Sequence, residues 1–284
     1  MFRQAVVQLA PVKGDIRANL AKLGQTLQAI AARSPDLVVL PEAALTGYFL
    51  QGGVRELALT QNELLEALDQ VYRQNWEGPL DLVVGFFERE GATYFNSAAY
   101  IELGGAGTIH VHRKVFLPTY GVFDEERFLS RSHRIQAFNT RLGRSAILIC
   151  EDFWHSLSAT LAALDGAEIL YVPSASPARG FSAEEPANVM RCKALAQTVA
   201  AEHGIYVTVA SLAGFEGGKG MSGGSVIAGP AGNLLGEAPL FEPAVLWGEI
   251  DLERIPPIRY DSPLLSDLKA GLALLLPDLR RVSE

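Results

Sequence analysis

Cysteine is scarce in this sequence of 284 residues, in which only Cys150 and Cys192 occur. Two thiols cannot build the disulfide framework of a small secreted protein. One bridge between them could still form, but the opening residues contain too short an apolar run for a signal peptide. We therefore expect a cytoplasmic protein, whose reducing surroundings keep both thiols free.

Long apolar runs and an excess of positive charge are also missing. No segment approaches the roughly 18 consecutive apolar residues of a membrane-spanning helix. The 24 basic residues are outnumbered by 32 acidic ones, which leaves a net charge of −8, and they form no basic stripe. A nucleic-acid-binding protein needs such a stripe to neutralise phosphates. We therefore expect neither a membrane nor a nucleic acid as a partner.

The composition is typical of a globular protein with a large core, because 49% of the residues are hydrophobic and 20% are charged. No linker rich in glycine, serine or proline divides the chain. We expect a single domain over residues 1–284, in which 255–284 form a C-terminal arm followed by a helix. The apolar helix at 264–276 would need a surface to cover, which favours a homodimer or a higher homo-oligomer.

Short apolar strands alternate with helical patterns along the chain. Strands are expected at 5–9, 37–40, 82–87, 95–102, 108–113, 145–149, 168–173, 205–211, 225–228 and 246–250, and helices at 19–33, 56–73, 155–164 and 187–203. Fully apolar strands between helices are covered on both faces, and the hairpin signature at Gly104–Gly107 adds antiparallel pairs. The pattern predicts an α/β fold, and a four-layer α-β-β-α sandwich of two mixed sheets fits it.

Three reactive side chains follow strands, two of them apolar and one the second strand of a hairpin, and strand ends are where α/β proteins place functional loops. They are Glu42, Lys114 and Cys150. Taken singly, each has a plain alternative: a solvated carboxylate, a charge on an edge strand, and a cysteine that fills the core. Taken together they suit acyl transfer, because a carboxylate can accept the proton of an attacking thiol while an ammonium stabilises the oxyanion. This chemistry needs no metal and no organic cofactor.

The segments that contain these residues resemble the nitrilase, or carbon-nitrogen hydrolase, superfamily. The matching motifs are Pro41–Tyr48, His112–Pro118 and Ile149–Trp154, and the likeness extends to Gly223–Gly232. The resemblance implies the α-β-β-α sandwich, with Glu42 as general base, Lys114 as oxyanion stabiliser and Cys150 as nucleophile. The family often has a second active-site glutamate after the lysine. Glu125 matches it, and the adjacent Glu126 is the alternative.

A narrower resemblance is to the glutaminase domain of glutamine-dependent NAD synthetase. The residues that carry it are Lys114–Glu125 and Cys150–Trp154. It implies that Tyr48 and Tyr120 lie at the substrate end of the pocket, and that Ser176 binds the amino-acid end of the substrate. Glu151, next to the cysteine, completes the expected substrate-binding set.

The sequence therefore predicts a cysteine-dependent amidohydrolase that cleaves a non-peptide C–N bond of a small amide through a thioester and releases ammonia or an amine. Whether the amide is glutamine stays open. The alternatives are a stand-alone glutaminase subunit that supplies ammonia to a separate synthetase, a nitrilase, and a non-enzymatic scaffold. A separate synthetase is considered because 284 residues leave no room for a second domain of comparable size.

Overall fold

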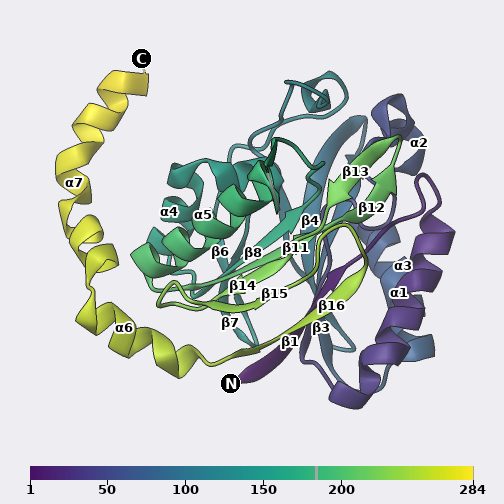
Figure 1. Ribbon diagram of the computed structural model, residues 1–284, viewed down its shortest axis with the longest axis horizontal. Coiled ribbons are helices and arrows are strands. Elements are labelled where there is room, and N and C mark those ends of the chain that lie inside the picture. The colour runs from purple at the N-terminus through teal and green to yellow at the C-terminus, as the bar shows by residue number, and fades with distance from the viewer. Residues whose placement is uncertain (183–184, 284) are drawn as a thin grey trace.

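Two six-stranded sheets lie face to face in the computed structural model, which describes residues 1–182 and 185–283 (Figure 1). The first sheet has the order β16 (Ala244–Ile250), β1 (Phe2–Gln8), β2 (Leu37–Val39), β3 (Leu80–Glu90), β4 (Thr93–Leu103) and β5 (Gly107–Arg113). Strands β1, β2 and β3 run parallel, and the remaining neighbours are antiparallel. The sheet is therefore mixed, and the hairpin expected at Gly104–Gly107 joins β4 to β5.

The second sheet repeats this plan. Its order is β15 (Leu234–Glu237), β14 (Val226–Ala228), β11 (Tyr206–Ser211), β8 (Ile169–Ser174), β7 (Gly143–Ile147) and β6 (Ala137–Thr140). Strands β7, β8 and β11 are parallel, and antiparallel strands flank them on both sides. Four long helices accompany the two sheets: α1 (Ile16–Ile30), α3 (Gln61–Asn75), α4 (Ser156–Leu164) and α5 (Ala187–His203).

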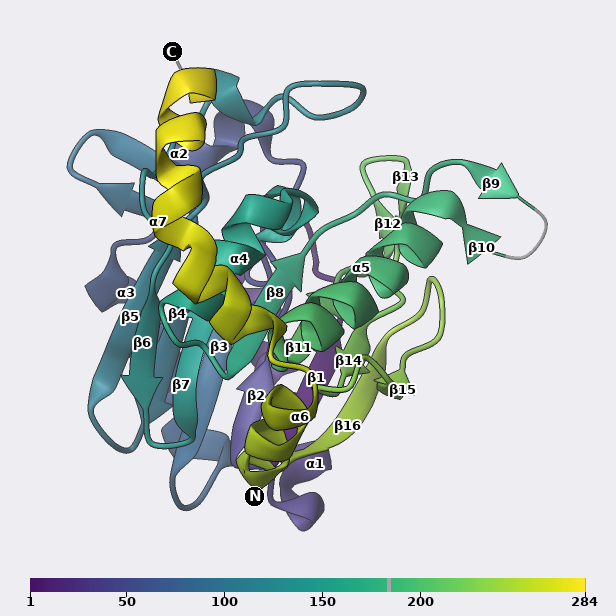
Figure 2. The same ribbon diagram turned by 90° about the vertical axis from the view of Figure 1, so that its left-hand side faces the viewer.

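Alternation of side chains along the strands explains the layers. In β1, Ala5 and Val7 pack with the apolar side chains of α1 and α3, whereas Val6 faces the second sheet. On the other side, alanines such as Ala159 of α4 and Ala196 of α5 cover the outer face of the second sheet. The result is a four-layer α-β-β-α sandwich (Figures 1 and 2). The predicted fold class is confirmed.

One helix of the predicted set is two helices. Helix α2 (Val54–Leu57) ends at Ala58, whose backbone is extended, and α3 begins only after Thr60. The Thr60 side chain accepts a hydrogen bond from the backbone of Glu63, and the Glu63 carboxylate accepts one in return from the backbone of Thr60. This capping box starts a new helix. The prediction of one helix over 56–73 is wrong because leucine spacing continues across the break.

The C-terminal region is helical on both sides of Pro263. Helix α6 (Ile255–Asp261) has Pro256 and Pro257 in its first turn, where the backbone N–H groups have no intrahelical acceptor and proline is tolerated. The arm expected before the C-terminal helix therefore begins with a helix of its own. Helix α7 (Leu264–Ser283) follows and lies on the side of the molecule that carries α4 and α5 (Figure 1).

Two further expectations concern the cysteines and the membrane. Cys150 and Cys192 are both free, and Cys192 packs against the core between α5 and the second sheet. Within residues 1–182 and 185–283, no helix combines the length and apolar character needed to cross a membrane.

Candidate active site

Glu42 stands in a tight turn that follows β2 and packs against β3. The Gly85 N–H donates to the Pro41 carbonyl at 3.1 Å, and the Ala44 N–H donates to the Gly85 carbonyl at 3.0 Å. A Cβ atom at Gly85 would lie 2.5 Å from both Glu42 Cα and the Pro41 oxygen. Only glycine permits this approach of the two backbones. The turn holds the Glu42 side chain in a position that is completely buried.

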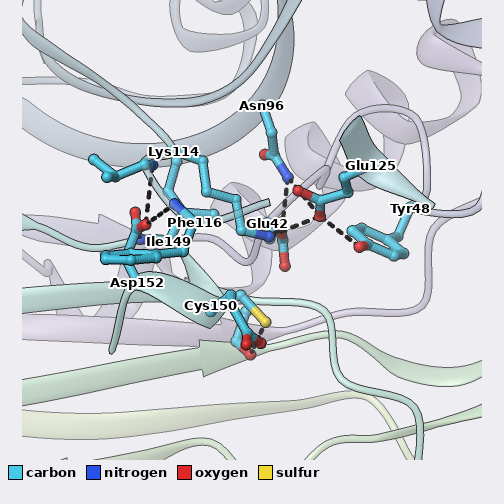
Figure 3. A network of polar contacts seen from close by, with 12 residues as sticks. Glu42, Tyr48, Asn96, Lys114, Phe116, Glu125, Ile149, Cys150 and Asp152 are labelled. Atoms are coloured by element: carbon cyan, nitrogen blue, oxygen red, sulfur yellow. Dashed lines mark hydrogen bonds and ion pairs between the residues drawn. The ribbon is translucent and has the colours of Figure 1, made fainter. Parts of the chain in front are cut away.

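Lys114 directly follows β5. Its backbone N–H donates to the Asn96 carbonyl at 2.8 Å and so continues the pairing with β4. Its buried ammonium donates to Glu42 Oε1 at 2.8 Å and to Glu125 Oε1 at 2.7 Å (Figure 3). One ammonium group therefore joins two carboxylates.

The surrounding charges and burial shift the pKa values of Lys114 and Glu125. Burial on its own would lower the pKa of the Lys114 ammonium, but Glu125 and Glu42 outweigh burial and hold that pKa well above its usual value. Lys114 is therefore charged. Burial raises the pKa of Glu125 to about 7. Lys114 lowers this pKa, but the Glu42 carboxylate raises it and partly offsets the effect of Lys114. Glu125 consequently titrates near neutral pH.

Two neutral groups complete the network around the carboxylates. The Asn96 amide donates to Glu42 Oε1 at 2.7 Å, and the Tyr48 hydroxyl donates to Glu125 Oε1 at 2.5 Å. Of the two adjacent glutamates, Glu125 is the one that lies here, and Glu126 forms an ion pair with Arg131 at the surface. The structure thus places Tyr48 beside Glu125 in the buried interior.

Cys150 opens a 3-10 turn over Cys150–Trp154, beyond the end of β7. Its φ is +45°, a left-handed conformation that residues other than glycine rarely adopt and that stores strain. Burial, and next the Glu42 carboxylate, raise the pKa of its thiol above the usual value, against the lowering by Lys114 and the Ser174 hydroxyl. Ser174 Oγ donates to Cys150 Sγ at 3.5 Å. At rest Cys150 is a protonated thiol that needs a base to become nucleophilic.

The other residues expected at the substrate end lie farther out. Tyr120 is 48% exposed, and its hydroxyl donates to the Glu151 carboxylate at 2.9 Å. Ser176 lies on the segment after β8, and its hydroxyl accepts a hydrogen bond from the Asn188 amide at 2.9 Å. Tyr120 and Glu151 therefore form one polar pair that solvent reaches, separate from the buried network of Tyr48.

A cavity of about 60 Å³ lies beside the buried network. Tyr48 and Glu125 border it, and its remaining wall is largely aromatic and aliphatic, with Phe49, Phe123 and Leu129 among the lining residues. Cys150 does not line it. The cavity therefore adjoins the carboxylate side of the site and not the thiol.

Comparison with known proteins shows the family of the chain. The carbon-nitrogen hydrolase family matches residues 3–260 of the chain. The chain belongs to the carbon-nitrogen hydrolase family. The family resemblance expected from the motifs is thereby confirmed, and the protein is a hydrolase that acts on C–N bonds.

Relatives of this carbon-nitrogen hydrolase have several activities. A glutamine-dependent NAD(+) synthetase of Thermotoga maritima is 27% identical over 89% of this chain and 42% of its own length. An N-carbamoylputrescine amidase of Solanum tuberosum is 26% identical over 92% of this chain and 90% of its own. A solved carbon-nitrogen hydrolase of Helicobacter pylori G27 has a TM-score of 0.86 at 25% identity, and the match covers 97% of this chain and 98% of that one. The chain spans less than half the length of the NAD synthetase.

Sequence reasoning missed two polar residues of the candidate site, Asn96 and Ser174. Asn96 stands within the apolar strand β4 and is completely buried. A buried amide almost always has a hydrogen-bond partner, so an asparagine inside an apolar strand was the available signal. Ser174 ends β8, and the sequence drew attention instead to Ser176, two residues later.

Proposed function

We propose that this carbon-nitrogen hydrolase is a cysteine-dependent amidohydrolase that cleaves a non-peptide C–N bond of a small amide through a thioester. The state of the Glu42 carboxylate is the observation that supports this most directly. Its Oε1 accepts hydrogen bonds from Lys114 and Asn96, whereas its Oε2 is buried and has no partner among the described residues. One oxygen is held in place, and the other is open to accept a proton, as a general base requires.

The reaction proceeds in two halves. As the Cys150 sulfur attacks the amide carbon, its proton passes to Glu42. Glu42 then gives the proton to the amide nitrogen, the C–N bond breaks, and ammonia or an amine leaves behind a thioester. A water molecule next loses a proton to Glu42 and attacks the thioester carbon. The C–S bond breaks, the carboxylic acid is released, and the proton returns to sulfur.

Lys114 serves the oxyanion that forms in each half. Its ammonium is charged and is held by Glu42 and Glu125, so it needs no rearrangement when negative charge develops on the carbonyl oxygen. The backbone N–H of Glu151, directly after the nucleophile, is the second donor in this proposal. Glu125 helps to hold the Lys114 ammonium in place through its contact at 2.7 Å.

The part of the substrate that is not cleaved is assigned to Tyr48, Tyr120, Glu151 and Ser176. Tyr120 and Glu151 present a hydroxyl and a carboxylate where solvent can reach them, and Ser176 adds a second hydroxyl. The cavity beside Tyr48 is lined largely by aromatic and aliphatic side chains, so the polar contacts to the substrate are assigned to these four residues. These features favour a small amide with a polar end.

A second candidate function is a glutaminase that supplies ammonia to a separate synthetase subunit. The support is the likeness to glutamine-dependent NAD(+) synthetases, which extends over 89% of this chain. Glutaminase activity that rises when a synthetase is added would distinguish this function from independent hydrolysis of another amide.

An ammonia-release screen tests the proposed function. Linear amides, glutamine and aliphatic nitriles are offered to the wild type, to Cys150→Ala and to Cys192→Ala, a control that changes the other free thiol. We expect release from at least one amide, a thioester on Cys150 by mass spectrometry, full activity in Cys192→Ala and none in Cys150→Ala. Full activity in Cys150→Ala would refute the mechanism. Turnover of nitriles alone indicates a nitrilase, and absence of any thioester indicates a scaffold.

We also propose a homodimer or higher homo-oligomer that forms through α7. Helix α7 has a leucine stripe with helical spacing. Its first members, Leu268 and Leu272, are partly covered, whereas Leu275, Leu279 and Val282 continue the stripe and are 49%, 43% and 68% exposed. We assign a second copy of the chain as the partner that covers these exposed side chains.

A further inference from the structure

The carboxylate of Asp152 collects four N–H contacts in the interior of the protein. Its Oδ1 accepts from the backbone of Val115 at 3.0 Å and of Phe116 at 2.9 Å. Its Oδ2 accepts from the backbone of Ile149 at 3.1 Å (Figure 3). The same oxygen lies 2.8 Å from His112 Nε2. The side chain is completely buried. These contacts fill the acceptor positions of the carboxylate.

Every one of these contacts adjoins a residue of the proposed mechanism. Val115 and Phe116 directly follow Lys114, and His112 precedes it on β5. Ile149 directly precedes Cys150, and Asp152 itself lies two residues after the cysteine. Strand β5 belongs to the first sheet and β7 to the second. One carboxylate therefore joins the segment of the lysine to the segment of the nucleophile, across the two sheets.

Each segment depends on this carboxylate for its local shape. After Arg113 the chain leaves β5, so the backbone N–H groups of Val115 and Phe116 have no strand partner, and Asp152 supplies their acceptor. The bond from Ile149 closes the turn in which Cys150 adopts its left-handed φ. The same side chain thus stabilises the strained turn and anchors the lysine segment.

We propose that Asp152, together with His112, is a positioning residue that fixes the Lys114 ammonium relative to the Cys150 sulfur. Neither side chain touches the reacting atoms. The inference rests on the proposed function, because its effect on catalysis is observed through amide hydrolysis. A displacement of about 1 Å in such a site costs about 100-fold in rate. Because Asp152 contacts both segments, loss of its contacts would allow the lysine and the cysteine to move relative to one another.

The variant Asp152→Asn isolates this role. Asparagine has one acceptor oxygen where aspartate has two, so either the Ile149 N–H or the pair of N–H groups after Lys114 loses its acceptor. The size and shape of the side chain are nearly unchanged. Asp81→Asn is the matched control, since Asp81 is also buried, accepts hydrogen bonds from Tyr100 and Arg141, and lies at the far end of β3.

The first measurement uses an amide that the full-length wild type hydrolyses, at a temperature at which every variant is folded by circular dichroism. We expect Asp152→Asn to lower kcat about 100-fold and to change KM by less than about threefold, because positioning acts in the transition state. Asp81→Asn should lose thermal stability and keep its kcat. If Asp152→Asn does not fold, His112→Ala replaces it, with an expected loss of about tenfold because one contact of four is removed.

The second measurement is independent of amide turnover. Lys114 lowers the pKa of the Cys150 thiol, so a displaced ammonium should raise it and slow the alkylation of Cys150 by iodoacetamide at a given pH. We expect slower alkylation in Asp152→Asn and no change in Asp81→Asn. A wild type that alkylates normally but hydrolyses no amide would refute the proposed function alone. A folded Asp152→Asn that retains kcat and alkylation within twofold of the wild type, or equal losses in Asp81→Asn, would overturn the positioning role.

Discussion

The Glu42 carboxylate and the Lys114 ammonium form an ion pair of 2.8 Å in which neither side chain is exposed. Two charges in the interior stabilise one another only when their geometry is good and their remaining hydrogen-bonding groups are satisfied. Asn96 also donates to the Glu42 oxygen that Lys114 contacts. The pair is therefore held from one side, which leaves the second oxygen of Glu42 for proton transfer.

Glu42→Gln should abolish most of the activity and leave the protein folded. An amide cannot accept the thiol proton, so kcat for amide hydrolysis should fall by about 10²–10⁴-fold. Lys114 keeps its contact with Glu125, which helps to preserve the fold. Steady-state kinetics with thermal denaturation as a check would measure both effects. The control is Glu126→Gln at the surface, and more than a tenth of wild-type kcat in Glu42→Gln would contradict the role as base.

Glu125 should make the stability of the protein depend on pH. Burial raises its pKa from 4.5 to about 7, so the folded state binds this proton more tightly than the unfolded state. The free energy of unfolding should therefore decrease as pH rises from about 4.5 to 7, by on the order of 1–3 kcal/mol for this group. Glu125→Gln cannot release the proton and should show a smaller decrease.

Denaturant unfolding at several pH values within this window would measure the effect of Glu125. Glu126→Gln serves as the matched control, because Glu126 is the adjacent residue and pairs with Arg131 at the surface. Its stability should follow the wild-type pH dependence. An identical slope in Glu125→Gln and the wild type would show that Glu125 does not titrate in this range.

The positions of Glu42, Lys114 and Cys150 were predictable because each follows a strand, and strand ends gather at sheet edges. The contacts that hold them were not. Asp152 reaches back to residues near Lys114, and Glu216 contacts Tyr48 from 168 positions away. Such pairings depend on how two sheets face each other, and no local periodicity encodes that arrangement.

Gly85→Ala should damage the site through the backbone. The new methyl group would lie 2.5 Å from Glu42 Cα and the Pro41 oxygen, which are backbone atoms and cannot turn aside. The turn must shift, which we expect to cost about 1–3 kcal/mol of stability and, by displacing Glu42, about tenfold or more in kcat. Thermal denaturation and kinetics would measure this. Gly271→Ala in α7, where no atom lies within 4 Å, should be harmless, and wild-type kcat in Gly85→Ala would contradict the close approach.

Glu216→Gln should act on the site through Tyr48. Glu216 ends β12 (Ala213–Glu216), and its carboxylate accepts the backbone N–H groups of Tyr48, at 2.9 Å, and of Phe49. Glutamine offers one acceptor oxygen, so one N–H is left without a partner and the Tyr48 hydroxyl should move away from Glu125. We expect kcat to fall about tenfold. In a double-mutant cycle, Tyr48→Phe combined with Glu216→Gln should lose little more kcat than Tyr48→Phe alone. Additive losses of kcat would show that the two residues act independently.

Charge on the uncovered stripe of α7 should prevent self-association. Leu275 and Leu279 are half exposed on the same face of the helix, and a second copy that covers them would bury apolar area worth about 25 cal/mol per Å². We expect the wild type to sediment as a dimer or larger species and Leu275→Glu/Leu279→Glu as a monomer with a similar thermal midpoint, because neither leucine is buried in the single chain. Arg280→Gln, on the polar side of α7, should leave the assembly unchanged. A monomeric wild type, or an unaltered mass in the double variant, would exclude α7 as the interface.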